Sequence, residues 1–287
     1  MAGIHWGKAH STVQGRSLRR GRLLLSCTGL LALLLAGCGA NANSPTVLAK
    51  NQVFVWPYDN SVTSISGNGH GEVLDPAVNT TLMDAPTIAM LYSGLVTFDS
   101  SLHVVPDAAT WDVDSTGTIY TFHLRHNMHF SDGTPITASD YAYSLDRSLD
   151  PTLCTVLDSA TYGPNASGAC QGSPPPSQSY LGNILGASAR LSGTGGTDHS
   201  VVGKGDDPQH GVDVIDPYTL RIRLARPVGF FLESLSYSTS YPVEQSLIQK
   251  YPNGLWVDHL DEGGCSGPFK IQSYNNGQKL TLVPNPY

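Results

Sequence analysis

Apolar and polar residues alternate along several short stretches of the chain, a period typical of strands with one buried face. Tyr120, Phe122 and Leu124 alternate with polar residues in this way. Turn-forming residues at 114–117 separate them from a shorter strand pattern at 111–113. The pattern predicts a β-hairpin over this part of the chain.

Two more hairpins and one short strand are predicted elsewhere along the chain. The second hairpin begins at Val212 and turns at residues 216–217, and the third spans residues 269–283 with its turn at Asn-Gly 276–277. A short apolar strand is expected over residues 52–56. The recurrent hairpins predict mixed, mostly antiparallel sheets.

Helical periodicity appears in two places. Residues 84–96 are predicted to form a helix after Pro86, with one apolar face made by Ile88, Leu91 and Tyr92. A second helix begins after Thr137, which has Asp140 at the capping-box position, and its apolar face contains Ala142, Leu145 and Leu149. Together with the hairpins these helices indicate an α/β fold of the mixed α+β kind.

Residues 151–207 have little periodicity and contain runs of proline and glycine. We interpret them as a loop-rich insertion with one short helix near residues 180–186. The glycines at 192–196 are not followed by the Gly-Lys-Ser/Thr of a phosphate-binding loop, so they predict an ordinary surface loop.

Composition narrows the class of protein. Of 287 residues, 40% are hydrophobic and 14% are charged, and 30 glycines and 19 prolines indicate many turns. The formal net charge of −7 gives no basic face for nucleic acid, so we expect no such partner.

The N-terminus has the pattern of an export signal. Residues 1–37 combine a basic start with an apolar run at 23–36, too short for a membrane span, and end in Leu-Ala-Gly before Cys38. This ending resembles a bacterial lipobox, which implies a lipid on Cys38 and an anchored protein in the periplasm or on the outer face of the cytoplasmic membrane. The alternative is an ordinary secretory signal that contains a cysteine. Residues 38–48 are small and polar and predict a flexible tether.

Three cysteines follow the predicted lipidation site. Cys154 and Cys170 flank a loop rich in Gly, Pro and Ser, and we expect them to form a disulfide, leaving Cys265 unpaired. No Cys-x-x-Cys unit supports a metal site. His123 and His129 do not share a helical face with His126, so surface histidines are favoured over a metal-binding cluster.

An ordered series of short motifs runs through the chain beyond the tether. The motifs lie at residues 92–96, 105–107, 111, 120–125, 130–135, 140, 143–145, 150–151, 216–220, 266–270 and 284–286. The series resembles the family 5 extracellular solute-binding proteins, the peptide- and nickel-binding components of ABC importers.

The resemblance implies a two-lobed receptor of the type II periplasmic-binding-protein class that closes on its solute. Residues 49–287 would form its N-terminal lobe, with the second lobe missing because family members are longer. It further implies a peptide ligand, an ABC permease as partner, a monomer, no cofactor and no enzymatic activity. A nickel or other small-solute receptor and a truncated, non-binding lipoprotein scaffold are the alternatives. No Gly-x-Ser-x-Gly or His-Glu-x-x-His motif supports a hydrolase.

The resemblance also places residues 55–58 and 237–242 beside the family's solute cleft. The side chains expected to contact solute are Trp56, Pro57, Tyr58 and Tyr241. The alternative is that Trp56, Tyr58 and Tyr241 pack in the core or at a hinge. Tyr92, Trp111 and residues 132–133 are expected to be structural.

Overall fold

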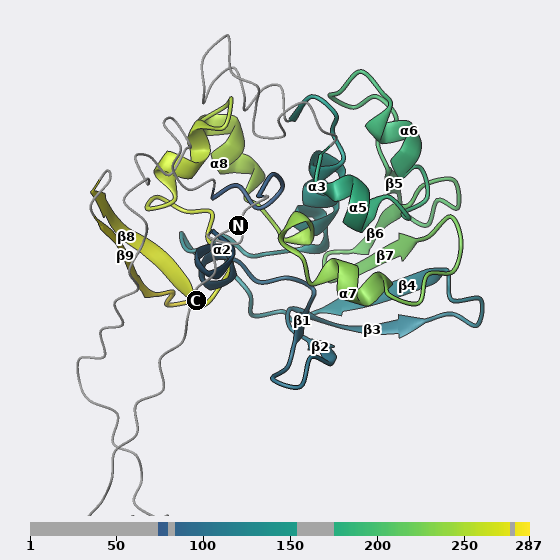
Figure 1. Ribbon diagram of the computed structural model, residues 1–287, viewed down its shortest axis with the longest axis horizontal. Helices are drawn as coiled ribbons and strands as arrows, with labels where there is room; N and C mark the ends of the chain where they lie inside the picture. Colours follow the sequence, from purple (N-terminus) through teal and green to yellow (C-terminus); the bar gives the residue numbers. More distant parts are fainter. Residues whose placement is uncertain (1–73, 80–83, 154–174, 276–278) are drawn as a thin grey trace, which may run out of the picture. The chain divides into compact units, whose positions relative to one another are not determined.

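The computed structural model describes residues 74–79, 84–153, 175–275 and 279–287, all within one compact unit, Pro57–Tyr287 (Figure 1). Several predictions lie outside these residues: the signal peptide, Cys38, the tether, the strand at 52–56, Trp56, Pro57, Tyr58, the Cys154–Cys170 disulfide and the turn at 276–277. Within the described ranges, no helix combines the length and the apolar character that crossing a membrane requires.

The largest sheet has five strands in the order β3-β4-β7-β6-β5. β3 (Ala109–Val113) and β4 (Ile119–Leu124) form the first predicted hairpin, and β6 (Val212–Asp216) and β7 (Thr219–Arg223) form the second. β4 and β7 join the hairpins in antiparallel pairing, whereas β5 (Val202–Lys204) pairs parallel with β6. Both predicted hairpins are confirmed.

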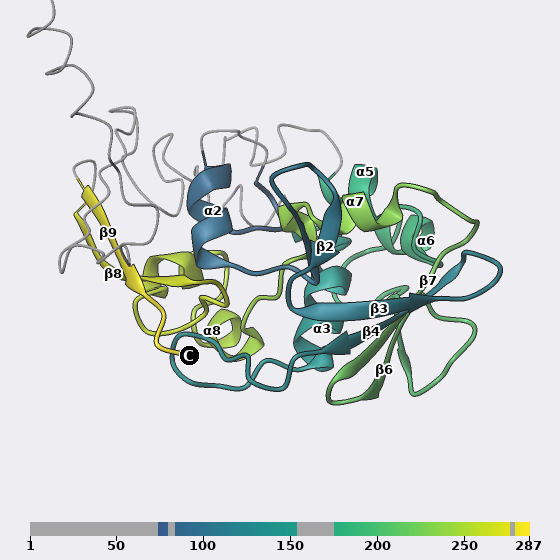
Figure 2. The same cartoon turned by 90° about the horizontal axis from the view of Figure 1, so that it is seen from below.

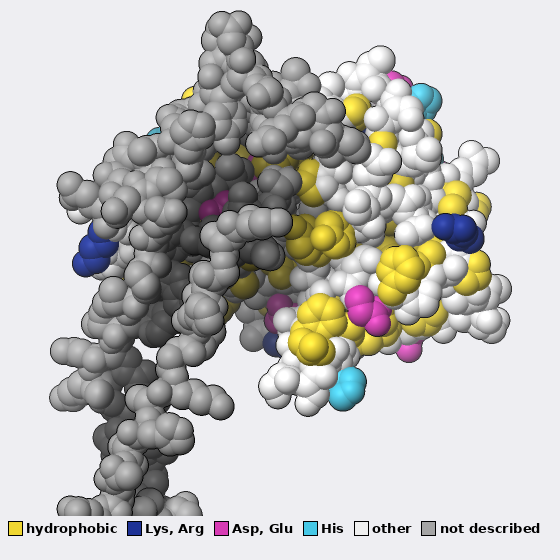
Figure 3. Space-filling view, viewed as in Figure 1, with side chains coloured by type: hydrophobic (Ala, Val, Ile, Leu, Met, Phe, Trp, Pro, Cys, Tyr) yellow, Lys and Arg dark blue, Asp and Glu magenta, His cyan; other side chains and the backbone are white. Residues whose placement is uncertain are grey.

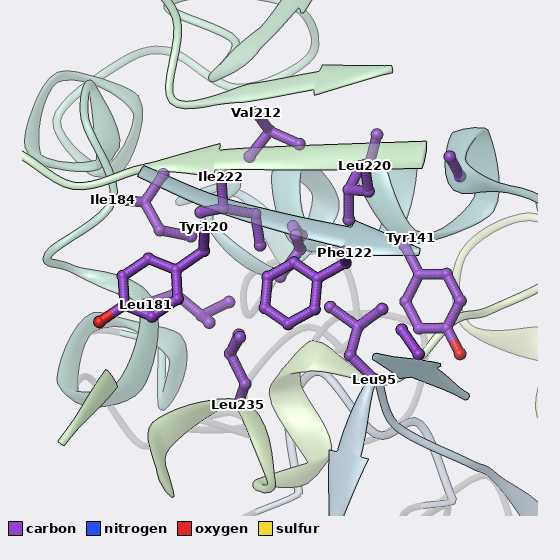
Figure 4. Close-up of a cluster of buried hydrophobic side chains, with 14 of the residues drawn as sticks. Leu95, Tyr120, Phe122, Tyr141, Leu181, Ile184, Val212, Leu220, Ile222 and Leu235 are labelled. Atoms are coloured by element: carbon purple, nitrogen blue, oxygen red, sulfur yellow. The ribbon is translucent and has the colours of Figure 1, made fainter. Parts of the chain in front are cut away.

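The alternation in β4 places its apolar residues in the main core. Phe122 lies opposite Leu220, and Tyr120 lies opposite Ile222, across the β4–β7 ladder. All four side chains are buried, and Figure 4 shows them facing Leu235 and other apolar residues from the helices that cover this face of the sheet. Burial of such side chains is the main favourable contribution to folding.

The two predicted helices are present, but one is shorter than expected. α3 (Ala138–Ser148) begins at the predicted capping box, in which the Asp140 carboxylate accepts hydrogen bonds from the Thr137 N–H and hydroxyl, both at 2.8 Å. α2 (Ala85–Leu91) ends before Tyr92, whose φ of −130° and ψ of 152° are extended. The predicted helical pattern over 84–96 therefore continued past the true end of the helix.

The described part of the segment predicted as a loop-rich insertion, residues 151–153 and 175–207, contributes to the sheet and the core, and its helical content differs from the prediction. Instead of one helix near 180–186, it contains α5 (Ser177–Leu181) and α6 (Ala187–Leu191), followed by β5. Gly186 precedes α6 with a φ of 86°, a left-handed conformation that separates α5 from α6. Leu181 and Ile184 are buried in the main core. The glycines at 192–196 lie in an irregular, largely exposed stretch, as expected of a surface loop.

The remaining elements divide between the main core and a second, smaller core. They are β1 (Val96–Phe98), β2 (Val104–Pro106), α7 (Phe231–Leu235), η1 (Ser238–Ser240), α8 (Gln245–Lys250), η2 (Leu255–His259), β8 (Phe269–Asn275) and β9 (Lys279–Pro284). The second core lies among α2, α8, η2 and β8, whereas β1, β2 and α7 pack in the main core. Trp256 is fully buried in the second core, together with Leu91 and Tyr92 of the α2 region. β8 and β9 are the strands of the third predicted hairpin and form a separate two-stranded sheet.

α3 contributes side chains to both cores, and Figure 2 shows it between α8 and the five-stranded sheet. Its apolar residues, among them Leu145, lie in the main core. On another side, Ser144 Oγ accepts the Val243 N–H at 2.8 Å, and Ser148 Oγ donates to the Thr239 carbonyl at 2.8 Å. These bonds attach the segment between α7 and α8 directly to the helix.

Cys265 is a buried free thiol, as expected, and burial raises its pKa to about 11. Because the thiolate is the nucleophile, we expect Cys265 to resist alkylation at pH 8 while the chain is folded and to react fully in guanidinium chloride. Peptide mapping of the alkylated protein by mass spectrometry checks this. Equal labelling rates in the two conditions would contradict it.

Candidate functional site

Four helices converge on η1 and the residues beside it. α2, α3, α5 and α7 all contact this short 3₁₀ helix. The segment that the sequence places beside a solute cleft, residues 237–242, therefore lies where elements distant in the chain meet. Side chains of this segment are therefore held in place by contacts from several helices.

Tyr241 is held by a hydrogen bond and by close packing. Its hydroxyl donates to the Ser236 carbonyl at 3.0 Å. Its ring lies against Gly94, where an added Cβ would approach Tyr241 Cε1 to 2.7 Å. Gly94 is therefore required for the approach of the two segments. The side chain remains partly exposed, and it packs against the second core.

Polar groups surround Tyr241 on its buried side. Tyr141 of α3 donates from its hydroxyl to the Ser93 carbonyl at 3.2 Å. Burial raises the pKa of Asp107, an effect that Arg125 opposes. Burial, followed by the nearby Asp107 carboxylate, raises the pKa of Tyr241 to about 12. Tyr241 is thus a neutral hydrogen-bond donor throughout the physiological range.

Replacing Tyr241 with Phe is expected to lower the free energy of unfolding by about 1 kcal/mol at pH 7, through loss of the bond to Ser236. Since the folded-state pKa of about 12 exceeds the unfolded value near 10, wild-type stability should fall as pH rises through this window. The advantage of the wild type over Tyr241→Phe should therefore shrink from pH 9 to pH 12.

Urea unfolding at a series of pH values measures this difference. Tyr218→Phe is the control, because Tyr218 is a partly exposed tyrosine stacked on His126. A constant difference between wild type and Tyr241→Phe across pH 9–12 would refute the predicted pH dependence.

A second pair of aromatic side chains lies at the same junction. The rings of Tyr180 on α5 and Tyr237 beside η1 are stacked, with centroids 3.8 Å apart and an interplanar angle of 8°. The Tyr237 hydroxyl donates to the Asn79 carbonyl at 3.4 Å. The hydroxyls of Ser238 and Thr239 are buried, and no described residue is hydrogen-bonded to them. The junction thus combines aromatic surface with buried polar groups.

Tyr92, Trp111 and Asp132, which the sequence suggested are structural, make packing and turn contacts. The Tyr92 hydroxyl donates to the Leu74 carbonyl at 3.1 Å in the second core. Trp111 packs against the main core. The Asp132 carboxylate accepts the N–H and hydroxyl of Thr134 at 2.8 and 2.7 Å, which stabilises the predicted turn.

The three histidines considered for metal binding have separate neighbours. His123 Nε2 lies 3.1 Å from Asp112 Oδ2, and the His126 ring stacks on Tyr218 with centroids 4.1 Å apart. His129 lies beside Tyr287, with ring centroids 5.9 Å apart. In the part of the chain that the structure describes, no three His, Cys, Asp or Glu residues are grouped so that they could hold a metal ion.

The chain is similar to a family of known proteins and to several of its members. Residues 103–287 match the model of "Bacterial extracellular solute-binding proteins, family 5 Middle". The periplasmic oligopeptide-binding protein OppA of Escherichia coli is 30% identical over 233 residues, covering 79% of this chain and 36% of OppA. The periplasmic murein peptide-binding protein MppA of the same organism is 27% identical over 261 residues, covering 91% of this chain and 41% of MppA.

A solved structure has the same fold. The Escherichia coli murein tripeptide binding protein MppA superposes with a TM-score of 0.57 at 28% identity, over 74% of this chain and 36% of that chain. The mixed α/β architecture is therefore that of a periplasmic-binding-protein-like lobe, as predicted. This chain spans less than half the length of the relatives it matches.

Proposed function

Because the chain belongs to the family 5 bacterial extracellular solute-binding proteins, we propose that it is part of a receptor that captures peptides for an ABC importer. The family match over residues 103–287 carries this proposal. OppA and MppA, the relatives described above, are named as oligopeptide-binding and murein peptide-binding proteins, which supports a peptide as the solute.

The proposed receptor works by binding and closure, without covalent chemistry or a cofactor. An extended peptide presents backbone donors and acceptors along its whole length. The junction at η1 offers the partly exposed aromatic surface of Tyr180 and Tyr237, which suits such a ligand. We propose solute contacts for Tyr241 and, outside the described residues, for Trp56, Pro57 and Tyr58. Contacts made only in the closed state would favour closure and docking on the permease.

Peptide binding can be tested by thermal stabilisation of the full-length protein after denaturation and refolding to remove bound solute. A ligand at 100 times its Kd stabilises the folded state by about 2.7 kcal/mol, so peptides should raise Tm in a saturable way. Nickel ions and amino acids serve as comparison ligands. Stabilisation by nickel alone would indicate the metal-receptor alternative, and no stabilisation by any solute would indicate a scaffold.

We also propose that Cys38 carries a lipid that anchors the receptor outside the cytoplasmic membrane. Stable anchoring requires more than one acyl chain, which a lipidated N-terminal cysteine can provide. Cells grown with labelled palmitate should yield a labelled protein, and Cys38→Ala should remove the label. Cys27→Ser, which changes a cysteine inside the apolar run, is the matched control and should keep it. Retention of label in Cys38→Ala would refute the anchor.

A further inference from the structure

The stacked pair of Tyr180 and Tyr237 is held in place by a shared support on α3. The Ser177 hydroxyl, at the start of α5, donates to the Ser148 carbonyl. The Ser148 hydroxyl donates in turn to the Thr239 carbonyl of η1 at 2.8 Å. One residue of α3 thus fixes both segments that carry the tyrosines, so the stack is arranged before any ligand arrives.

Part of the surface of the stacked tyrosine pair is exposed to solvent. Both rings are partly exposed, and Figure 3 shows hydrophobic side chains gathered over α7 and toward β1, with few charged groups among them. Aromatic rings attract a further ring in an offset or edge-to-face arrangement more strongly than their area alone predicts. A rigid, prearranged pair loses little side-chain entropy when it binds.

Two buried hydroxyls adjoin the stack. Ser238 and Thr239 follow Tyr237 directly in the chain, and their hydroxyls are buried without partners among the described residues. Buried hydroxyls normally have hydrogen-bond partners, so this pair is an exception within the segment that follows the stack. Because both hydroxyl oxygens are buried, the surface that this segment offers to a ligand is the aromatic ring of Tyr237.

We propose that the Tyr180–Tyr237 stack is a subsite that selects peptides with an aromatic side chain over their aliphatic counterparts. The inference rests on the proposed function, because it assigns a preference to a peptide receptor. Tyr180 and Tyr237 are the specificity-determining residues. The aromatic side chain of the bound peptide packs on the exposed surface of the pair.

The test compares alanine tripeptides that carry a single Phe or a single Leu at each position in turn, using calorimetry on the full-length protein. At one position, wild type should bind the Phe peptide about threefold to tenfold more tightly than the Leu peptide. Tyr180→Leu and Tyr237→Leu should remove this ratio while changing the affinity for the Leu peptide by less than about twofold. Tyr237→Phe keeps the ring and should preserve the ratio.

Tyr251→Leu is the matched control, since Tyr251 is also stacked, on His259 with centroids 3.5 Å apart, but away from η1. It should leave the ratio unchanged, and circular dichroism checks that each variant folds. Equal binding of Phe and Leu peptides by wild type would overturn the inference, as would a ratio that survives both Leu variants. If no peptide binds wild type, the proposed function fails as well, so the two failures are distinguishable.

Discussion

Arg190→Met is expected to lower the free energy of unfolding by about 3–5 kcal/mol, because it leaves two carboxylates without their buried cation. The Arg190 side chain is 1% exposed, and its guanidinium pairs with Asp146 at 3.3 Å and with Asp150 at 3.0 Å. It also donates to the carbonyls of Gly196 at 2.7 Å and Asp198 at 3.1 Å. Met fills similar volume but supplies none of these bonds.

Urea unfolding of both proteins measures the loss. Arg226→Met is the control, because Arg226 is exposed and should change stability by less than about 0.5 kcal/mol. Since Arg190 holds the stretch between α6 and β5 against α3, limited proteolysis of Arg190→Met should cut within residues 192–201 first. A loss below about 1 kcal/mol would mean that the network contributes little to stability.

The buried pair of Asp75 and Arg147 should have an effect of similar size. Asp75 is 2% exposed and Arg147 10%, and two hydrogen bonds join them at 3.0 and 2.5 Å. Arg147 also lies over the Trp256 ring, 5.8 Å from its centroid. Removal of either partner leaves the other charge buried and uncompensated, so Asp75→Asn and Arg147→Met should each cost about 3–5 kcal/mol.

A double-mutant cycle tests whether the pair acts as a unit. The double variant should lose less than the sum of the single losses, by about 1–3 kcal/mol, because no uncompensated charge remains. Lys250→Met is the control for an exposed pair, since Lys250 is 61% exposed beside Glu262, and it should lower stability far less than either single variant. Additive losses in the cycle would show that the two residues act independently.

Local patterns were sufficient where a structural element depends on its own residues. The alternation in β4 identified both the strand and its buried face, and the Thr137–Asp140 capping box located the start of α3. The length of α2 was overestimated because the apolar pattern continues past Leu91, whereas the chain turns to let Gly94 meet Tyr241. That approach depends on a distant segment and leaves no local signal.

The region between α3 and β6 was misread for the same reason. β5 has three residues, too few to show a period, and its order comes from parallel pairing with β6. The buried position of Arg190 depends on acidic residues of α3 and the loop after it. An arginine in a stretch rich in glycine carries no sign of burial until those partners are known.

The candidate site was only partly accessible to sequence reasoning. Tyr241 was expected beside the solute cleft from the family resemblance alone, and the fold adds its hydrogen bond to Ser236 and its close contact with Gly94. Tyr180 was missed because it lies in the stretch interpreted as an insertion. Its stacking partner, Tyr237, is remote in sequence, so neither residue alone indicated the pair.

The attachment of α3 to both cores limits how this part of the protein can bend. If one core rotated against the other, Val243 would separate from Ser144 and Thr239 from Ser148. Both bonds involve buried groups, for which water does not readily substitute. If the chain captures solute as proposed, the described residues on either side of these bonds should therefore move as one stiff piece. The pivot of any closing motion then lies elsewhere in the receptor, and a spectroscopic distance between labels on α6 and α8 should not change when peptide binds.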